Sequence, residues 1–430
     1  MVTYSCRLLS LAALASFCAN WQFAFQITYV NTSARSFYIL ASKAANLTHG
    51  SLSAEEWSMQ WGTIVSSFYP GSIIGFLLMP VMVARLGTKV SMGILSITSI
   101  AGCALQLLAT LPNAGMSLVD ISLCGGRVLV GIQAGAAFTP PTPHYLLQEG
   151  AEVNKVIESL QYYQGSIADL ATLQHEHSTV SAKTTPRGKI PPSSWKGFFI
   201  GSVAAMSYSF TADDLVDTFS AHILHGAQGS NAALEGYDGE LDTEADVMSM
   251  GLGVVLLLSS LCGSFLVDRF GRRPLIILGL ICTAVFNVLA AVFLNKNATL
   301  VLIFFALTKA SIGMGAGAPA WFLTSELVAI PFVPLLQSLS TGLLLCTSMI
   351  ATYFFLPVSL ISPQLSILIL STLPASVLAI LLFLFLPETK GKSSSQVQQL
   401  LSSRFLSGFA SKHKTDEVHP KISQYGSVEC

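Results

Sequence analysis

Ten apolar segments, each long enough to cross a membrane as a helix, determine what this chain can fold into. A spanning helix needs about 20 largely apolar residues. Charged residues make up only 10% of the chain, against about 25% in a soluble domain. The sequence therefore predicts an all-α, polytopic protein embedded in a lipid bilayer. The segments lie near residues 6–29, 62–84, 90–111, 116–139, 197–219, 247–267, 275–294, 299–323, 335–357 and 364–386.

The first segment has a second interpretation. Arg7 precedes an apolar stretch, and Ala13-Leu14-Ala15 has the A-x-A pattern of a signal-peptide cleavage site. The apolar character continues to Tyr29, which is longer than a signal peptide needs. A spanning helix is therefore the prediction, with a cleaved signal peptide as the alternative.

One charged loop sets the orientation of the helices. Arg269, Arg272 and Arg273 stand between two apolar segments, in the octet Val267–Pro274. Each arginine would cost about 2.5 to 3.5 kcal/mol at the centre of a bilayer, so the octet marks a membrane surface. Lysine and arginine concentrate in cytoplasmic loops, and the loops on this side hold most of them if every segment crosses once. Both termini are therefore predicted to be cytoplasmic.

Composition also excludes several classes of function. A net charge of −1 provides no basic footprint for nucleic acid. The eight cysteines lie mostly inside apolar segments, without the paired spacing of disulfides or metal sites, so we expect neither a metal nor a cofactor. Asn46 begins the sequon Asn46-Leu47-Thr48 in the first loop on the outer side, which predicts glycosylation there.

Three motifs carry a resemblance to a known family. The octet, V-D-R-F-G-R-R-P, resembles the loop signature of the major facilitator superfamily, in the form used by sugar transporters similar to the facilitative glucose transporter family. Gly315–Phe322, followed by Glu326, resembles the family's G-P-G-P-x-P-W-F and its glutamate, and Pro387–Gly391 matches its P-E-T-K-G ending. The resemblance implies a carrier of a hexose or related small polar solute, not an enzyme.

The resemblance further implies two helical bundles joined by a linker. We expect a truncated N-terminal bundle over 1–143, a cytoplasmic linker with intracellular helices over 144–195, a six-helix C-terminal bundle over 196–389 and a cytoplasmic tail over 390–430. Family members have six spans before the linker, whereas this chain has four. Because Gly126-Arg127 resembles the family's fourth helix, the fifth and sixth are the missing pair. Four helices leave an apolar groove, which predicts a covering partner chain or a collapsed bundle.

A substrate site follows from the same comparison. Gln22 and Gln26, with Asn31 downstream, are similar to the family's Q-Y-G-Y-N and following asparagine, and amides both donate and accept hydrogen bonds. The alternative places these polar residues near the outer interface. Trp321 stands where the family stacks an aromatic ring on the sugar, with plain packing as the alternative. The candidate substrate-binding residues are Gln22, Gln26, Asn31, Tyr208, Ser209, Asp213, Asp214, Trp321 and Thr347.

Acidic residues replace the family's glutamines in the segment 197–219. Asp213, Asp214 and Asp217 stand in or near a predicted span, where carboxylates are costly and are functional candidates by default. Lys309 is the lysine placed inside another span, about 16 Å deep at 1.5 Å per residue. A pair between Lys309 and one of the aspartates would relieve both charges. In the alternative, the helix ends early and the aspartates are in water.

Charged residues around the octet form a candidate gate. By resemblance, a cytoplasmic network would break as the inward side opens, and permanent anchoring of helix ends is the alternative. Arg127 and Glu149 are candidates for a matching cluster in the N-terminal bundle. The gating candidates are Arg127, Glu149, Asp268, Arg269, Arg272, Arg273, Glu326 and Glu388.

The resulting functional prediction is a facilitative carrier that works by rocking of two bundles about a central site, with the plasma membrane as its expected location. A proton-coupled sugar symporter that uses Asp213 or Asp214 is one alternative. A non-transporting sensor or scaffold, or a splice product of the family, is the other, because the missing fifth helix supplies part of the sugar cavity in family members.

Overall fold

The computed structural model describes residues 6–48, 52–86, 88–111, 115–136, 190–227, 243–294, 296–329, 332–392 and 394–403. Every regular element in these ranges is a helix, which confirms the all-α prediction. The first half of the molecule comprises α1 (Cys6–Thr48), α2 (Ala54–Ser66), α3 (Phe68–Leu86), α4 (Thr88–Leu107) and α5 (Met116–Ala136).

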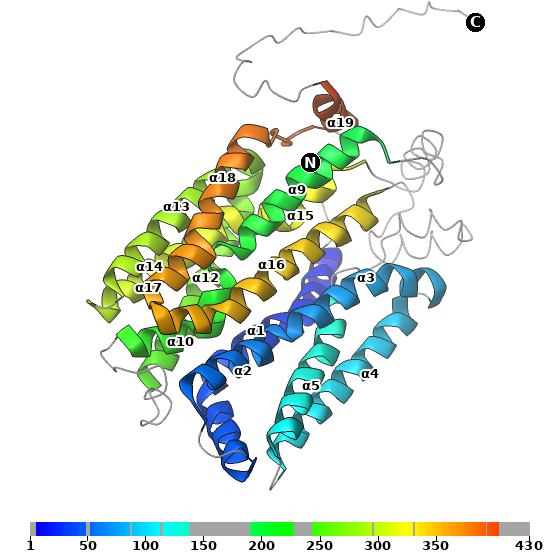
Figure 1. Cartoon of the computed structure of the whole chain (residues 1–430). Coiled ribbons are helices and arrows are strands. Elements are labelled where there is room, and N and C mark those ends of the chain that lie inside the picture. The colour runs from blue at the N-terminus through cyan, green and yellow to red at the C-terminus, as the bar shows by residue number, and fades with distance from the viewer. Residues whose placement is uncertain are drawn as a thin grey trace, which may run out of the picture.

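The second half begins with α9 (Pro192–Ser209) and α10 (Asp213–Ala227) and ends with the short α19 (Ser394–Ser403). Figure 1 shows the two halves side by side, with α16 running along the boundary. The helices between α10 and α19 are α12 (Thr243–Phe270), α13 (Arg272–Phe293), α14 (Ala298–Ser311), α15 (Gly317–Leu327), α16 (Val333–Ile361), α17 (Pro363–Ile367) and α18 (Leu373–Phe385).

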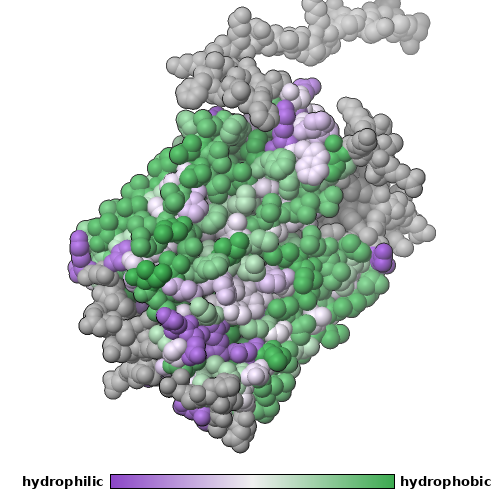
Figure 2. Space-filling model, in the orientation of Figure 1, coloured by the Kyte–Doolittle hydropathy of each residue, from purple (hydrophilic) through white to green (hydrophobic). Residues whose placement is uncertain are grey.

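Eight helical stretches are long and apolar enough to cross a membrane. Alongside them, α1 and the α9–α10 pair occupy the two remaining segments that the sequence predicts as spans. Hydrophobic side chains cover most of the visible face in Figure 2, as a bilayer requires. The eight stretches are Ala54–Met79, Val90–Thr110, Met116–Ala134, Glu244–Phe270, Arg272–Phe293, Ala298–Leu327, Val333–Ile361 and Pro363–Phe385.

Several helix boundaries differ from the sequence prediction. Helix α1 continues to Thr48, so Asn46 is exposed in the last turn of a helix and not in a loop. Helix α2 begins at Ala54, eight residues before the predicted segment, because Ser53 and Glu56 form a capping box that satisfies its first N–H groups. Helix formation therefore extends past the apolar residues at both places.

The two halves meet along two seams. Helix α1 packs against α10, and α2 and α3 pack against α16. Gly62 of α2 allows a close approach, because a Cβ atom there would lie 2.7 Å from the backbone oxygen of Tyr353. Small residues permit such contact between helices in a membrane, where packing replaces the hydrophobic effect as the main attraction.

A helix in the predicted tail extends the second half. Val397 and Leu401 of α19 are buried against α9 and α15. The Gln398 amide donates to the Leu327 backbone oxygen at 2.6 Å and accepts from the Ser194 hydroxyl at 3.2 Å. We call this end of the molecule the α19 end. Most of the predicted linker, 144–195, lies outside the described residues, and α9 begins inside its predicted range, at Pro192.

Candidate functional site

The candidate site is built around a break between α9 and α10. Residues Phe210–Ala212 interrupt the helix, and Ala212 adopts a φ of 72°, which is uncommon for a residue with a side chain. The backbone oxygen atoms that the break leaves unpaired accept hydrogen bonds from side chains of other helices. Ser371 donates to the Phe210 oxygen at 2.7 Å, and Asn287 donates to the Thr211 oxygen at 3.0 Å. Captured carbonyls make a broken helix tolerable inside a membrane.

Helix α10 restarts at two carboxylates. Asp213 and Asp214 occupy its first turn, where the unpaired N–H groups and the helix dipole favour negative charge. Both residues are buried, since Asp213 is 3% exposed and Asp214 is 8% exposed. The interpretation that these aspartates are in water is therefore wrong. The helix does end early, as that interpretation supposed, but the break keeps both acids in the protein interior.

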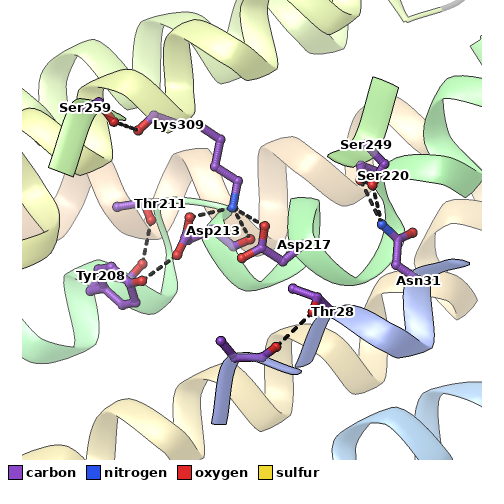
Figure 3. A network of polar contacts seen from close by, with 11 residues as sticks. Thr28, Asn31, Tyr208, Thr211, Asp213, Asp217, Ser220, Ser249, Ser259 and Lys309 are labelled. Carbon is purple, nitrogen blue, oxygen red and sulfur yellow. Dashed lines mark hydrogen bonds and ion pairs between the residues drawn. The ribbon is translucent and has the colours of Figure 1, made fainter. Parts of the chain in front are cut away.

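Lys309 neutralises part of this charge. Its ammonium nitrogen lies 2.6 Å from Asp213 Oδ1 and 2.5 Å from Asp217 Oδ1, and donates to the Asp213 backbone oxygen at 3.1 Å (Figure 3). Three acceptors match the three donors of an ammonium group. The predicted pairing of Lys309 with an aspartate of this segment is therefore confirmed, and it involves two carboxylates.

Aromatic rings extend from this cluster across the boundary between the halves. The Tyr208 hydroxyl donates to Asp213, and the Tyr208 ring packs edge-on against Trp321 at 5.6 Å between centroids. Trp321 in turn meets Phe23 of α1 at 6.4 Å, and Phe23 meets Phe68 of α3 at 5.6 Å. Trp321 thus lies where an aromatic wall passes from one half to the other.

Asn31 joins the two halves directly. Its amide nitrogen donates to the hydroxyls of Ser220 at 3.0 Å and Ser249 at 2.6 Å, and its oxygen accepts from the Ala221 backbone N–H at 3.2 Å. The contacts with Ser220 and Ser249 are visible in Figure 3. The predicted substrate-binding residue Asn31 thus contacts helices α10 and α12, and it is only 7% exposed.

The remaining predicted substrate residues are Ser209, Thr347, Gln26 and Gln22. Ser209 and Thr347 are in contact, with 3.0 Å between their hydroxyls, and Ser348 donates to Ser209 at 2.9 Å. Gln26 is 4% exposed and its side-chain oxygen has no hydrogen-bond partner among the described residues. Gln22 belongs to α1, but its side chain lies outside the part of the chain whose side chains are described.

Arg127 is buried in the first half. It lies mid-way along α5, is 1% exposed, and donates to the Tyr29 hydroxyl at 3.1 Å and the Val65 backbone oxygen at 3.2 Å. Its guanidinium also faces the rings of Tyr29 and Phe68. Glu149, its predicted partner, lies outside the described residues, so the matching gate cluster stays a prediction.

The charged octet is held by contacts within the second half. Arg272 Nε lies 3.2 Å from Glu326 Oε1, and its terminal nitrogen lies 3.7 Å from Asp268. The Glu388 carboxylate accepts from the backbone N–H groups of Arg272 and Arg273, both at 3.1 Å, and so caps α13.

Two further contacts complete this network. Arg273 donates to the Phe383 backbone oxygen at 2.8 Å, and Lys390 donates to the Arg269 backbone oxygen at 2.7 Å. These contacts connect α12, α13, α15 and the chain after α18, all of them in the second half.

Reasoning from sequence missed one buried amide. Asn287 is 0% exposed and also accepts a hydrogen bond from Thr308, at 3.1 Å, while it captures Thr211. Asn287 is the single amide inside the apolar segment 275–294. Its position there could have indicated a polar contact between helices, since a buried polar side chain needs partners.

Several known proteins resemble this chain in sequence. The family model described as "Sugar (and other) transporter" matches residues 8–139 and 134–401. The putative metabolite transport protein YncC of Bacillus subtilis is 24% identical over 280 residues, which cover 62% of this chain and 56% of that protein. The sugar transporter ERD6-like 18 of Arabidopsis thaliana is 25% identical over 344 residues, covering 75% and 67%.

The fold also has solved relatives. The inward-open structure of the xylose transporter XylE from E. coli superposes with a TM-score of 0.68 at 15% identity, covering 91% of this chain and 99% of that one. The chain spans only about 56% to 67% of the two curated relatives named above. The family model nevertheless matches most of the chain, and the chain therefore belongs to the sugar (and other) transporter family.

Proposed function

We propose that this protein is a facilitative carrier for a hexose or a related small polar solute, similar to the facilitative glucose transporters. The observation that carries the proposal is the aromatic and polar wall where the halves meet, Phe23, Trp321, Tyr208 and Asp213, in a chain of the sugar transporter family. Rings offer an apolar platform to a sugar's C–H groups, and polar groups pair with its hydroxyls. Rocking of the halves about this wall would expose it to each side in turn.

Purified protein in sealed liposomes tests the proposal. Labelled hexoses should enter down their gradient and reach saturation, while protein-free liposomes take up little. Transport should be weak and poorly selective, because a site discriminates by the buried polar groups that a wrong substrate leaves unpaired, and few of the family's amides remain. High-affinity glucose uptake with strong rejection of a deoxy analogue would contradict the expected selectivity. Absence of saturable flux for every polar solute would contradict the carrier itself.

The octet network is proposed to take part in gating from the α19 end. Arg272, Glu326 and Glu388 bind the ends of three helices into one unit. A rigid end allows the second half to move as a body against the first, which is how two-bundle carriers alternate. The remaining members, Asp268, Arg269 and Arg273, supply contacts to the same unit.

The missing fifth and sixth helices are also part of the proposal. The described residues before 137 contain four helical segments, α1, α2–α3, α4 and α5. Four helices leave an apolar groove along the first half, which lipid or a partner chain would cover. Cross-linking in native membranes from cysteines placed on exposed positions of α5, the helix that carries Arg127, distinguishes the two, since only a partner chain gives a discrete adduct. These positions include Leu118 and Ile121.

Location and orientation complete the proposal: plasma membrane, with both termini cytoplasmic and Asn46 on the outer side. Asn46 is exposed, as an acceptor of a glycan must be. Glycosidase treatment should increase the electrophoretic mobility of the wild type and leave Asn46→Gln unchanged. Epitope tags at either terminus should be accessible to antibody only after permeabilisation.

A further inference from the structure

The charges beneath the aromatic wall do not balance. Asp213 and Asp217 share the ammonium of Lys309, and Asp214 adds a third carboxylate in a residue that is 8% exposed. Three carboxylates against one ammonium leave two negative charges. Buried charge without a counter-charge is expensive, so Asp214 must either bind a proton or meet a cation.

The unbalanced carboxylate faces the boundary between the halves. Successive helix residues are about 100° apart around the axis, so Asp213 and Asp217 share the face that meets Lys309, while Asp214, Thr218 and Ala221 share the neighbouring face. Ala221 donates to Asn31 of the first half. The helix of Asp214 also packs against α16, which runs along this boundary (Figure 1).

Thr218 supplies a second, independent indication of a ligand. It is 2% exposed, and its hydroxyl has no hydrogen-bond partner in the part of the chain that the structure describes. A buried hydroxyl without a partner is destabilising. Its position one turn from Asp214, on the same face, puts an open acceptor next to the unbalanced carboxylate.

Aromatic rings lie close to the same position. The Tyr208 hydroxyl donates to Asp213, the chain neighbour of Asp214, and Trp321 packs on Tyr208. A carboxylate, a hydroxyl acceptor and aromatic faces together match a protonated amine, whose N–H groups need acceptors and whose charge is attracted to ring faces. A neutral sugar would satisfy the hydroxyl and leave the charge unbalanced.

We infer that the site at the boundary between the halves takes a hydroxylated solute that carries a protonated amine, such as an amino sugar, with Asp214 and Thr218 receiving the ammonium group. This inference rests on the proposed carrier function and specifies its substrate class. The remaining hydroxyls of the solute would face the wall of Tyr208 and Trp321, as a hexose would.

Equilibrium binding to the purified full chain tests the inference, with labelled D-glucosamine, D-glucose and N-acetyl-D-glucosamine as probes. Glucosamine should bind at least about tenfold more tightly than glucose, equal to about 1.4 kcal/mol. The acetylated sugar, which has no charge on its nitrogen, should lose this advantage. A plain amine, ethanolamine, should compete with glucosamine on the wild-type protein, a measurement that needs no variant.

Variants assign the charge to Asp214. Asp214→Asn should lower glucosamine affinity to that of glucose, whereas Asp214→Glu, which keeps the charge, should retain the preference. Thr218→Val should weaken glucosamine binding several-fold. Glu244→Gln is the matched control, because it removes a carboxylate from an exposed position on α12 and should change nothing.

Several results would overturn the inference. Equal binding of the three sugars would do so, as would absence of any binding, or an Asp214→Asn variant that still prefers glucosamine. Glucose uptake that requires sodium or a proton gradient and is lost in Asp214→Asn would assign the charge to a coupled ion instead. Flux measurements separate this inference from the carrier proposal. Amine-selective binding without flux would refute only the carrier, and glucose flux without amine preference would refute only the inference.

Discussion

The ammonium of Lys309 and the carboxylate of Asp213 form a buried ion pair, 2.6 Å long, that connects α14 to the restart of α10. Both side chains are almost wholly buried, at 0% and 4% exposed. The pair therefore holds the broken helix in place in the protein interior. Removing one partner leaves a buried charge uncompensated, which is the costly way to break such a pair.

Lys309→Met should destabilise the protein by about 3 to 5 kcal/mol, because Asp213 and Asp217 would both lose their cation. Unfolding in mild detergent measures the change. Adding Asp213→Asn and Asp217→Asn to Lys309→Met should recover much of the loss. The control Lys296→Met removes an exposed lysine and should be nearly neutral. A Lys309→Met variant as stable as the wild type would show that the cluster does not hold the fold together.

Asn31→Leu should loosen the contact between the halves. It removes three hydrogen bonds to Ser220, Ser249 and Ala221, each worth about 0.5 to 1.5 kcal/mol net. A cysteine at Val216, buried in the wild type, should react with a water-soluble maleimide roughly tenfold faster in the Asn31→Leu background. Thr32→Val, on the exposed side of α1, should leave the rate unchanged. Equal rates in all three backgrounds would exclude Asn31 as a contact that limits opening.

Arg272→Ala should change the accessibility of the α19 end, because it removes the ion pair with Glu326 and the contact with Asp268. A modest shift between states is expected, since a carrier's conformations differ by only a few kcal/mol. Cysteine labelling on α15 and transport rates measure it. If Arg272→Ala alters neither, the network serves only as an anchor of helix ends.

Ala212→Gly should stabilise the protein by about 1 kcal/mol. Ala212 has a φ of 72°, and a left-handed conformation costs a residue with a Cβ atom about 1 to 2 kcal/mol. Part of that gain is lost to the greater freedom of glycine in the unfolded chain. Thermal unfolding is the measurement, and a clear loss of stability would contradict the expected strain.

Gly271→Ala should have the opposite effect, with a loss of about 1 to 3 kcal/mol. Gly271 adopts φ 96° and ψ 169°, a region that only glycine occupies readily, and a Cβ atom there would lie 2.8 Å from the Glu388 carboxylate. Gly251→Ala is the matched control. Its Cβ would contact nothing within 4 Å, so a helical alanine should be slightly stabilising there. Comparable stability of the two variants would contradict this reading of the octet.

The sequence alone determined the fold class and much of the chemistry of the site. Ten apolar segments predicted the helices, because hydrocarbon tolerates few other structures. The isolated Lys309 and the aspartates of segment 197–219 predicted an ion pair, because buried charges need partners, and the structure confirms it. The assignments of substrate-binding and gating roles stay predictions.

Only the tertiary structure decided where the helix breaks and what Asn31 contacts. Phe210-Thr211-Ala212 contains neither glycine nor proline, so local sequence gave no reason to interrupt a helix there. The break is stable because Ser371 and Asn287, far along the chain, capture the freed carbonyls. Asn31 likewise contacts Ser220 and Ser249, which lie 189 and 218 positions further along the chain. Such partners are invisible to local patterns, because the energy of a captured polar group depends on which distant residue folding brings beside it.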